Sequence, residues 1–356
     1  MKKIGLVIFL FVCHLSCQNH KDSENTREIQ INGEHAFRGV NLNIPIEILS
    51  IEDYLIIKND SRVEPFFETY DTRTESKINS FGKKGKGPGE MIFPGSVFFS
   101  EELEKLFIHD PILSQILYIN DLDLFSSVPS PKKYCEFPRE GFYPFKTLLL
   151  DSCFVMQGVS KESERWQFHP IGSKYNHIKG YYREDLIQGK IDGISSFRKL
   201  MALMGSVKVV ANEENDRIAT IFNYSDLIEI YDVQKDSIIG SSDFEQPIIR
   251  NYSGNGLNDL ARIDKQNIIG YHDICVANDL IYCLYSDMTV SDVLESGNRG
   301  HGNEIHVFDW NAEFLCKLIL DIPVHCITYD KINNTIIGIR DAPEPEIIYF
   351  NNPKIR

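Results

Sequence analysis

The sequence has too little positive charge for a nucleic-acid-binding protein. Its 37 lysine and arginine residues stand against 51 aspartate and glutamate residues, which gives a formal net charge of −14. Binding to phosphate backbones requires clustered cationic side chains. Nucleic acid is therefore not an expected partner.

Signatures of catalysis are equally sparse. The sequence contains no GxSxG nucleophile elbow, no P-loop and no dinucleotide-binding fingerprint. The segment His301–His306 (HGNEIH) differs from HExxH, and the alternation around His306 is typical of a strand, so no zinc site is expected there. His109, His272 and Arg340 are each followed by aspartate, which makes them the residues of greatest chemical interest. Catalytic and metal-ligating residues stay unassigned, and a non-catalytic protein is favoured.

The N-terminal apolar run, Ile4–Val12, is too short to cross a bilayer as a helix. It follows two lysines and precedes His14-Leu15-Ser16-Cys17, an order typical of a signal peptide that ends in a lipobox. A lipobox cysteine is acylated and becomes the first residue of the mature protein. We expect a signal peptide at residues 1–16 and a lipid on Cys17, with a simple secretory signal as the alternative.

The polar residues 17–27 are expected to form a flexible tether behind that lipid. The predicted location is the cell envelope, with the lipid in the outer membrane and the protein either in the periplasm or on the surface. The membrane is thus an expected partner.

No CxxC pair occurs among the six cysteines that follow Cys17. An even number in an exported protein permits disulfides without requiring them. Cys275 and Cys283 flank a predicted turn at Asn278-Asp279, which sets Cys275 opposite Tyr282, so a direct bridge is not expected. Most of these thiols lie in apolar strand patterns, and buried, unreactive cysteines are favoured.

The body of the chain repeats a pair of short strands. In each pair the second strand is rich in aliphatic and aromatic residues, and most end at Asp or Asn. Six such pairs are found, with the segments YLIIKND and FFETYD, KLFIHDP and ILYIND, CFVMQG and WQFHPIGSKYN, RIATIFNYSD and LIEIYD, DLIYCLYSD and EIHVFD, and TIIGIRD and EIIYF.

Repeats at this spacing predict an all-β fold, a six-bladed β-propeller with four-stranded blades, over residues 28–356. A β-sandwich would not need the recurring hairpin, and a βαβ fold would need helices between the strands. A short helical insertion is expected around residues 182–204. We expect Glu28–Ile31 or Ala36–Val40 to close the ring by pairing beside Glu346–Phe350.

The segment FGKKGKGPGE, followed by Phe93-Pro94, resembles a loop between the first two blades of bacterial six-bladed propeller lipoproteins that are described as TolB-like. The resemblance implies the propeller fold and the envelope location, but no biochemical activity. We expect a structural interblade loop rather than a phosphate-binding loop, because Pro88 follows where a P-loop has Ser or Thr leading into a helix. Its structural residues are Gly82, Gly85, Gly87, Pro88, Gly89 and Glu90, and Glu90 is expected to accept hydrogen bonds from the loop amides rather than act as an acid or base.

The connections between the second and third strands open on the same face as the connections between blades. Polar residues at these strand ends make the predicted ligand-binding set, Asp60, His109, Asp110, Asp287, Arg340 and Asp341. The alternative is that they only satisfy turn amides.

The favoured function is a membrane-anchored scaffold for a glycan, peptide or protein. Its rival is a metal-dependent hydrolase, lactonase or lyase at the channel mouth. No cofactor is predicted, although carboxylates on this face leave room for a divalent cation.

Overall fold

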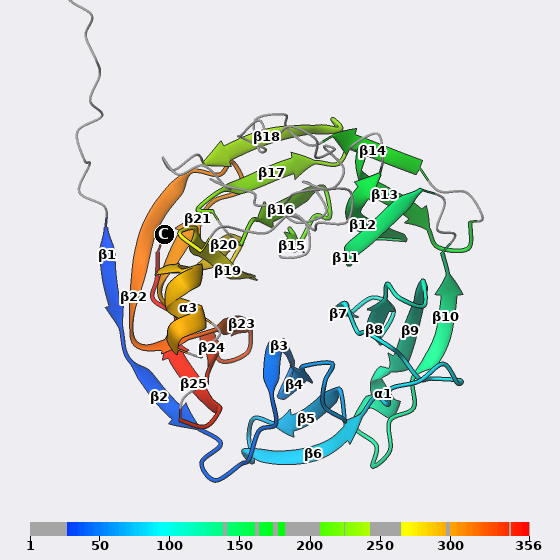
Figure 1. Ribbon diagram of the computed structural model, residues 1–356, viewed down its shortest axis with the longest axis horizontal. Helices are drawn as coiled ribbons and strands as arrows, with labels where there is room; N and C mark the ends of the chain where they lie inside the picture. The colour runs from blue at the N-terminus through cyan, green and yellow to red at the C-terminus, as the bar shows by residue number, and fades with distance from the viewer. Residues whose placement is uncertain are drawn as a thin grey trace, which may run out of the picture.

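Six β-sheets surround a central axis as the blades of a propeller (Figure 1). The computed structural model describes residues 27–137, 141–160, 164–173, 177–181, 207–223, 225–242, 265–296, 300–341 and 343–355. The predicted all-β, six-bladed fold is confirmed. The predicted helical insertion at 182–204 lies outside the described residues, as does the predicted signal peptide at 1–16.

The first three blades each contain four antiparallel strands in chain order, with the first strand innermost. Blade 1 consists of β3 (Pro45–Ile51), β4 (Tyr54–Asn59), β5 (Phe67–Asp71) and β6 (Ser76–Phe81). Blade 2 consists of β7 (Ser96–Ser100), β8 (Lys105–Asp110), β9 (Gln115–Asn120) and β10 (Lys132–Glu136). Blade 3 consists of β11 (Phe142–Leu150), β12 (Cys153–Ser160), β13 (Glu164–Pro170) and β14 (His177–Tyr181).

The last three blades keep this order, with additions from the start of the chain in blades 5 and 6. Blade 4 consists of β15 (Lys208–Ala211), β16 (Arg217–Ile221), β17 (Ile228–Asp232) and β18 (Ser237–Ser242). Blade 5 contains β19 (Ile268–Ala277), β20 (Leu280–Thr289), β21 (Gly302–Phe308) and β22 (Phe314–Val324). Blade 6 contains β23 (Cys326–Asp330), β24 (Thr335–Arg340) and β25 (Glu346–Asn351).

The start of the chain closes the ring differently from the expectation. β2 (Gly33–Ala36) pairs antiparallel with β25 and completes blade 6, so the closing strand shares only Ala36 with one of the two predicted ranges. β1 (Glu28–Ile31) pairs instead with β22 in parallel and adds a fifth strand to blade 5. The expectation that Glu28–Ile31 would lie beside Glu346–Phe350 is therefore wrong. The edge of β22 offers β1 unpaired backbone groups before the chain reaches blade 6.

Turn chemistry explains why so many third strands end in Asp. Asp71 Oδ1 accepts hydrogen bonds from the amides of Arg73 and Thr74 at 2.8 and 2.9 Å. Asp330 ends the first strand of blade 6 and accepts from two turn amides in the same way. A carboxylate that satisfies turn amides sets the direction of the next strand.

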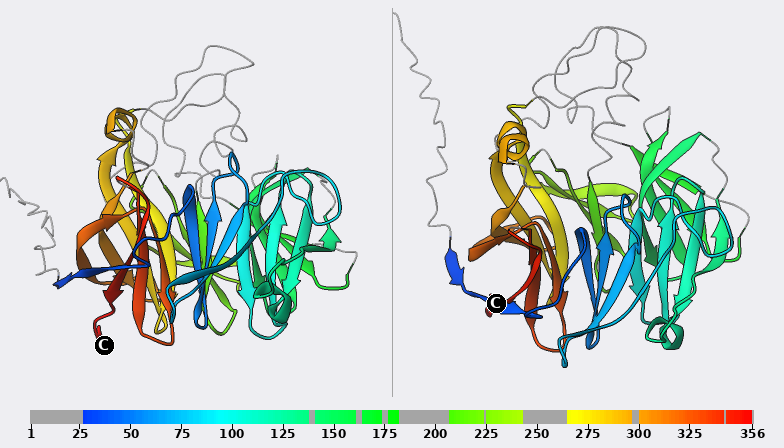
Figure 2. Two further views of the ribbon diagram at one scale, coloured as in Figure 1. Left: turned by 90° about the horizontal axis from the view of Figure 1, so that it is seen from below. Right: turned by 60° about the horizontal axis from the view of Figure 1, so that its bottom comes forward.

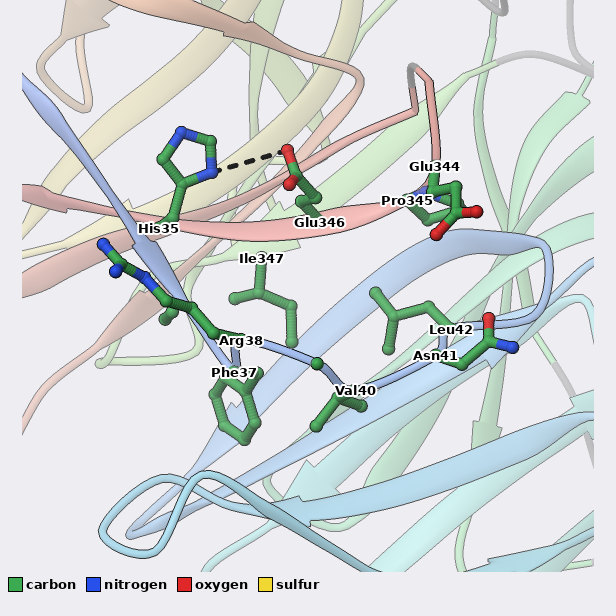
Figure 3. Close-up of a pocket in the computed structure, with 12 residues that line it drawn as sticks. His35, Phe37, Arg38, Val40, Asn41, Leu42, Glu344, Pro345, Glu346 and Ile347 are labelled. Carbon is green, nitrogen blue, oxygen red and sulfur yellow. Dashed lines mark ion pairs between the residues drawn. The ribbon is translucent and has the colours of Figure 1, made fainter.

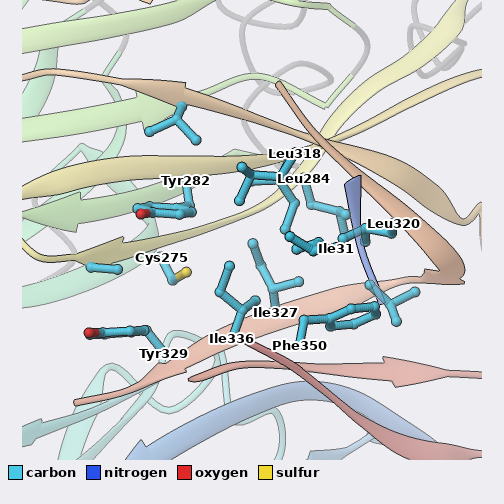
Figure 4. Packing of buried hydrophobic residues seen from close by; sticks show 14 of the residues in the cluster. Ile31, Cys275, Tyr282, Leu284, Leu318, Leu320, Ile327, Tyr329, Ile336 and Phe350 are labelled. Atoms are coloured by element: carbon cyan, nitrogen blue, oxygen red, sulfur yellow. The ribbon is translucent and has the colours of Figure 1, made fainter. Parts of the chain in front are cut away.

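The core lies between adjacent blades. Figure 4 shows one such layer, in which Tyr282 and Leu318 of blade 5 pack with Ile336 and Phe350 of blade 6. The second and third strands of the blades are almost wholly buried because both of their faces are covered by neighbouring blades. Their continuous apolar runs follow from this.

The six cysteines of the propeller are all unpaired, and four of them are buried. Cys275 lies opposite Tyr282 in the β19–β20 ladder, as predicted from the turn between them. The interpretation of these cysteines as buried and unbridged is thus confirmed for Cys275, Cys283, Cys316 and Cys326, whereas Cys135 and Cys153 are partly exposed.

The propeller has two unlike faces, each marked by a short helix (Figure 2). α3 (Val290–Ser296) connects the second and third strands of blade 5, and α1 (Asp121–Leu124) connects the third and fourth strands of blade 2. We call these the α3 face and the α1 face. The connections from blade to blade also open on the α3 face. Among the described residues, no helix is long and apolar enough to cross a membrane.

Candidate functional site

The central channel is lined by the innermost strand of each blade. These strands, β3, β7, β11, β15, β19 and β23, are neighbours around the ring. Each reaches the α3 face where the chain enters a new blade. Polar side chains near these strand ends can therefore converge at the channel mouth.

Five charged side chains form what we call the channel cluster, namely Glu47, Lys58, Lys146, Lys208 and Asp273. Lys58 Nζ lies 2.5 Å from Glu47 Oε2 and donates a hydrogen bond to the carbonyl oxygen of Gly95 at 3.1 Å. Lys208 Nζ lies 2.9 Å from Asp273 Oδ1. Two lysines are thus paired with two carboxylates.

The third lysine, Lys146 on β11, has no such partner. Among the described residues it makes no hydrogen bond and no ion pair within 4.0 Å, although it is partly buried. Burial, together with the positive charges of Lys58 and Lys208, lowers the pKa of Lys146 from 10.5 to about 8 against the opposing attraction of Glu47. The cluster therefore carries one positive charge in excess, at Lys146.

The positive charges of the three lysines favour the ionised form of the Glu47 carboxyl. Burial alone would raise its pKa, but Lys58, Lys208 and Lys146 together lower the pKa from 4.5 to about 2. Glu47 is consequently ionised at any physiological pH. Its charge holds the lysines together without cancelling all three.

A second group lies on the α3 face between blades 5 and 6. His301 precedes β21, His325 precedes β23, and Asp341 follows β24. His325 Nδ1 lies 3.2 Å from Asp341 Oδ1, and His301 Nε2 lies 4.0 Å from Asp341 Oδ2. One ligand atom from each residue lies within 4.8 Å of the other two. We call this the histidine–aspartate cluster.

The two imidazoles of this cluster are held differently. His325 Nε2 lies 3.1 Å from the carbonyl oxygen of Pro45, which fixes the ring on blade 1. His301 Nε2 is buried and makes no hydrogen bond with the described residues. Burial, and to a smaller extent Arg340, lowers the pKa of His301 although Asp341 opposes this.

His272 on β19 lies within electrostatic reach of both groups. Burial is the main cause that lowers its pKa from 6.5 to about 4, and the charges of Lys208 and His301 act in the same direction. Its side chain is buried, and Nε2 has no hydrogen-bond partner among the described residues. Asp273, the next residue, binds Lys208 and the amide of Ile327 rather than orienting His272.

The predicted ligand-binding residues of blade 2 have structural partners. His109 is buried, and its Nδ1 lies 2.9 Å from Thr147 Oγ1. Burial and the charge of Lys146 lower its pKa from 6.5 to about 3. Asp110 accepts hydrogen bonds from four backbone amides at 2.6 to 3.2 Å, those of Ile92, Phe93, Ile112 and Leu113.

The other predicted residues lie on three blades. Asp60 in blade 1 forms an ion pair with Arg62 at 2.8 Å. Asp287 in blade 5 is exposed. In blade 6, Arg340 Nε lies 3.7 Å from Glu346, whereas Asp341 belongs to the histidine–aspartate cluster. Asp341 is thus the one predicted residue in either of the two groups described above.

The glycine-rich loop is built around Glu90. Gly82 and Gly89 have positive φ angles of 85° and 75°. Gly85 and Gly87 do not, but a Cβ atom on either would lie within 3 Å of the Glu90 carboxylate. The amide of Gly87 donates to Glu90 Oε2, as expected for an acceptor of loop hydrogen bonds.

A cleft of about 260 Å³ lies at the outer rim, where the chain passes from β2 into blade 1 (Figure 3). Two of its polar side chains pair: His35 Nδ1 lies 3.4 Å from Glu346 Oε2, which also faces Arg340 outside the cleft. Phe37, Leu42 and Ile347 beneath it belong to the core. We interpret this cleft as a consequence of ring closure.

Several residues of the channel mouth could not be predicted from the sequence. Lys146 and Lys208 stand singly in apolar strands, and Glu47 resembles the polar face of an ordinary strand. His325 has no motif around it. The available signal was that each residue lies on an innermost strand or just before one, which becomes visible only when the six hairpins are assembled into a ring.

Comparison with known proteins agrees with this architecture. A family model described as TolB-like 6-blade propeller-like matches residues 21–331. No curated protein sequence matches the chain significantly. Solved structures with a similar fold include a member of the DUF4221 family from Bacteroides vulgatus, with a TM-score of 0.59 and 10% identity over 91% of this chain and 97% of that one.

Two further structures share the fold. A putative exported protein from Bacteroides fragilis has a TM-score of 0.52 and 12% identity, over 92% of this chain and 100% of that one. A luciferin-regenerating enzyme has a TM-score of 0.51 and 10% identity, over 91% of this chain and 95% of that one. At these identities the similarity concerns the fold alone.

Proposed function

The chain belongs to the TolB-like six-bladed propeller family, and from this premise we propose that it is an exported, lipid-anchored binding protein that takes an anionic ligand at its channel mouth. The observation that carries the proposal is Lys146. Its ammonium group has no hydrogen bond or ion pair within the described structure, while the other two lysines of the channel cluster have carboxylate partners. A carboxylate or phosphate group would supply the missing partner.

The surroundings of Lys146 favour binding over a purely structural role. A cation that is partly removed from water without a partner destabilises a fold, because its lost hydration is not compensated. Lys58 and Lys208 add repulsion. An anion in the channel would offset both the lost hydration and the repulsion, so these two effects favour anion binding.

Export and anchoring are supported by the N-terminal segment. Its short apolar run after two lysines fits a signal peptide, and Cys17 stands where a lipobox cysteine would stand. A similar fold occurs in the putative exported protein from Bacteroides fragilis. We propose the outer membrane as the site of anchoring, with the α3 face open to a glycan, peptide or protein that presents the anion.

Isothermal titration calorimetry at pH 7 tests the anion site. The probes are inorganic phosphate, citrate and glucuronate, with glucose as the uncharged control. At least one anion should bind, and Lys146→Met should weaken it about tenfold or more, because the ligand loses its charged partner. Lys331→Met is the matched control, since Lys331 is an exposed lysine next to a strand end on the α1 face.

Equal binding by the two lysine variants would overturn the proposal, and so would the absence of binding by all three anions. Thermal unfolding of each variant shows whether the fold is retained. Retained folding together with lost anion binding is the expected result for Lys146→Met.

A metal-dependent hydrolase, lactonase or lyase is the second candidate. It is favoured by the histidine–aspartate cluster, because catalytic metal sites commonly combine His and carboxylate ligands with an open position. Turnover of a simple lactone or ester that depends on added metal and is lost in Asp341→Asn would select this function. Binding without turnover would select the first.

A further inference from the structure

Three separate connections in blades 5 and 6 bring metal-binding side chains together. His301 comes from the α3–β21 connection, His325 from the connection between blades 5 and 6, and Asp341 from the connection after β24. All three connections open on the α3 face. No local motif links them, so the arrangement is a product of the propeller topology.

The hydrogen bonding of His325 shows which of its nitrogens faces the cluster. The carbonyl oxygen of Pro45 can only accept, so Nε2 of His325 must donate to it. In the neutral imidazole, Nδ1 then carries a lone pair, and it lies 3.2 Å from Asp341 Oδ1, which is also an acceptor. These two atoms attract one another only when a proton or a cation lies between them.

The same hydrogen bond is typical of a metal-ligating histidine. Such residues usually donate their second ring N–H to a carbonyl or a carboxylate, which fixes both the tautomer and the direction of the ligand atom. Pro45 supplies that carbonyl from blade 1. His325 is therefore oriented by one blade toward ligand partners on the neighbouring blades.

One of the distances between ligand atoms already fits a small cation. With metal–ligand bonds of about 2.0 to 2.1 Å, two ligand atoms of a tetrahedral centre lie about 3.3 Å apart. His325 Nδ1 lies 3.2 Å from Asp341 Oδ1, which meets this value. His301 Nε2 lies 4.0 Å from the other carboxylate oxygen, Oδ2, and the three ligand atoms lie within 4.8 Å of one another, so His301 must move toward the other two residues to complete the site. The buried Nε2 of His301 makes no hydrogen bond with the described residues, so no such bond among them has to break for that approach.

We propose that His301, His325 and Asp341 bind one divalent transition-metal ion of the zinc class, with at least one coordination position open. Two imidazole nitrogens and one carboxylate select zinc, cobalt, nickel or iron over magnesium and calcium, which prefer all-oxygen ligands. The site lies at the channel mouth, where an open position can receive a ligand. Its residues differ from the lysines of the channel cluster, so metal binding and anion binding can be lost separately.

The test is a titration of untagged, EDTA-treated protein with Zn²⁺, and with Ca²⁺ and Mg²⁺ for comparison. We expect one Zn²⁺ per chain and a much weaker response to the two hard cations. His301→Ala and Asp341→Asn should each weaken Zn²⁺ binding about tenfold or more. His35→Ala is the control, since His35 is a partly exposed histidine whose carboxylate partner, Glu346, lies outside the cluster.

Co²⁺ gives an independent readout on the wild-type protein. Visible absorption bands of a nitrogen-ligated, low-symmetry Co²⁺ centre should appear at one equivalent and disappear on addition of Zn²⁺. This measurement decides the question even if a variant fails to fold. Zn²⁺ binding that is unchanged in both variants, or wild-type protein that gives neither Zn²⁺ binding nor Co²⁺ bands, would show that the cluster is only an ion pair.

Discussion

The carboxylate of Glu90 accepts a hydrogen bond from the amide of Gly87, three residues before it, at 2.7 Å. The intervening turn closes around this contact, and Gly85 approaches the same carboxylate so closely that a Cβ atom would lie 1.9 Å from Oε2. The lysines of the loop point elsewhere, since Lys83, Lys84 and Lys86 are exposed. The loop is therefore a folded support between blades 1 and 2, organised by one internal anion.

Gly89→Val should destabilise the protein by more than about 1 kcal/mol. Gly89 has a φ of 75°, and its Cβ position lies 2.4 Å from the carbonyl oxygen of Pro131. Urea unfolding measures the change in the free energy of unfolding. Lys84→Ala, an exposed substitution in the same loop, should change it little. Equal effects of the two substitutions would contradict the view that glycine geometry builds the loop.

Asp110→Ala should lower the free energy of unfolding by roughly 3 kcal/mol, because buried backbone amides lose their acceptor. Asp110 is fully buried and serves four amides in two connections. Asp287→Ala is the control, because Asp287 is exposed, and its effect should stay within about 0.5 kcal/mol. If Asp110→Ala instead folds with normal stability and loses ligand binding, Asp110 is a binding residue after all.

The buried histidines predict a loss of stability in mild acid. The pKa of His109 is about 3 in the folded protein and 6.5 in its reference state, so only the unfolded chain takes up the proton between these values. Stability from His109 is thus complete above pH 6.5 and falls by about 1.4 kcal/mol per pH unit below it. His109→Asn should give a correspondingly flatter pH profile between pH 6 and about 4, measured by urea unfolding. An unchanged slope would mean that His109 is protonated in the folded protein.

The hairpins, their order and the six-bladed ring could be predicted because each depends on local pattern. Alternating apolar strands that end at residues such as Asp71 and Asp232 specify turns wherever they occur. The Glu90 contact was predictable for the same reason, since it joins residues within one loop.

Contacts between distant segments could not be predicted in this way. The sequence of Glu28–Ile31 is compatible with pairing to the free edge of either β22 or β25. Only the position of β22 in the folded ring decides which edge it pairs with. The contacts and the electrostatic surroundings of Lys146, Lys208 and His325 come from residues on other blades. The residues next to them in the sequence do not indicate which partners they have. For the same reason, Asp60, Asp110 and Asp341 look alike in sequence and have different partners in the structure.

Lipid attachment at Cys17 remains a prediction, because the first 26 residues lie outside the described structure. Cys17→Ala should release the protein from the membrane fraction or leave its precursor uncleaved. Cys13→Ala should do neither, since Cys13 follows the bulky Val12. Immunoblots of fractionated cells distinguish these results. Membrane association that persists in Cys17→Ala would exclude the lipid anchor.

The parallel pairing of β1 with β22 has a mechanical consequence. Any tension applied to the chain ahead of Glu28 first loads the four residue pairs between β1 and β22. β2, which holds the ring closed against β25, comes under load only after that short ladder has separated. β1 therefore protects the ring closure from mechanical load. A pull on the N-terminal segment can separate this one outer strand from β22 while the pairing of β2 with β25, and with it the channel mouth, stays intact.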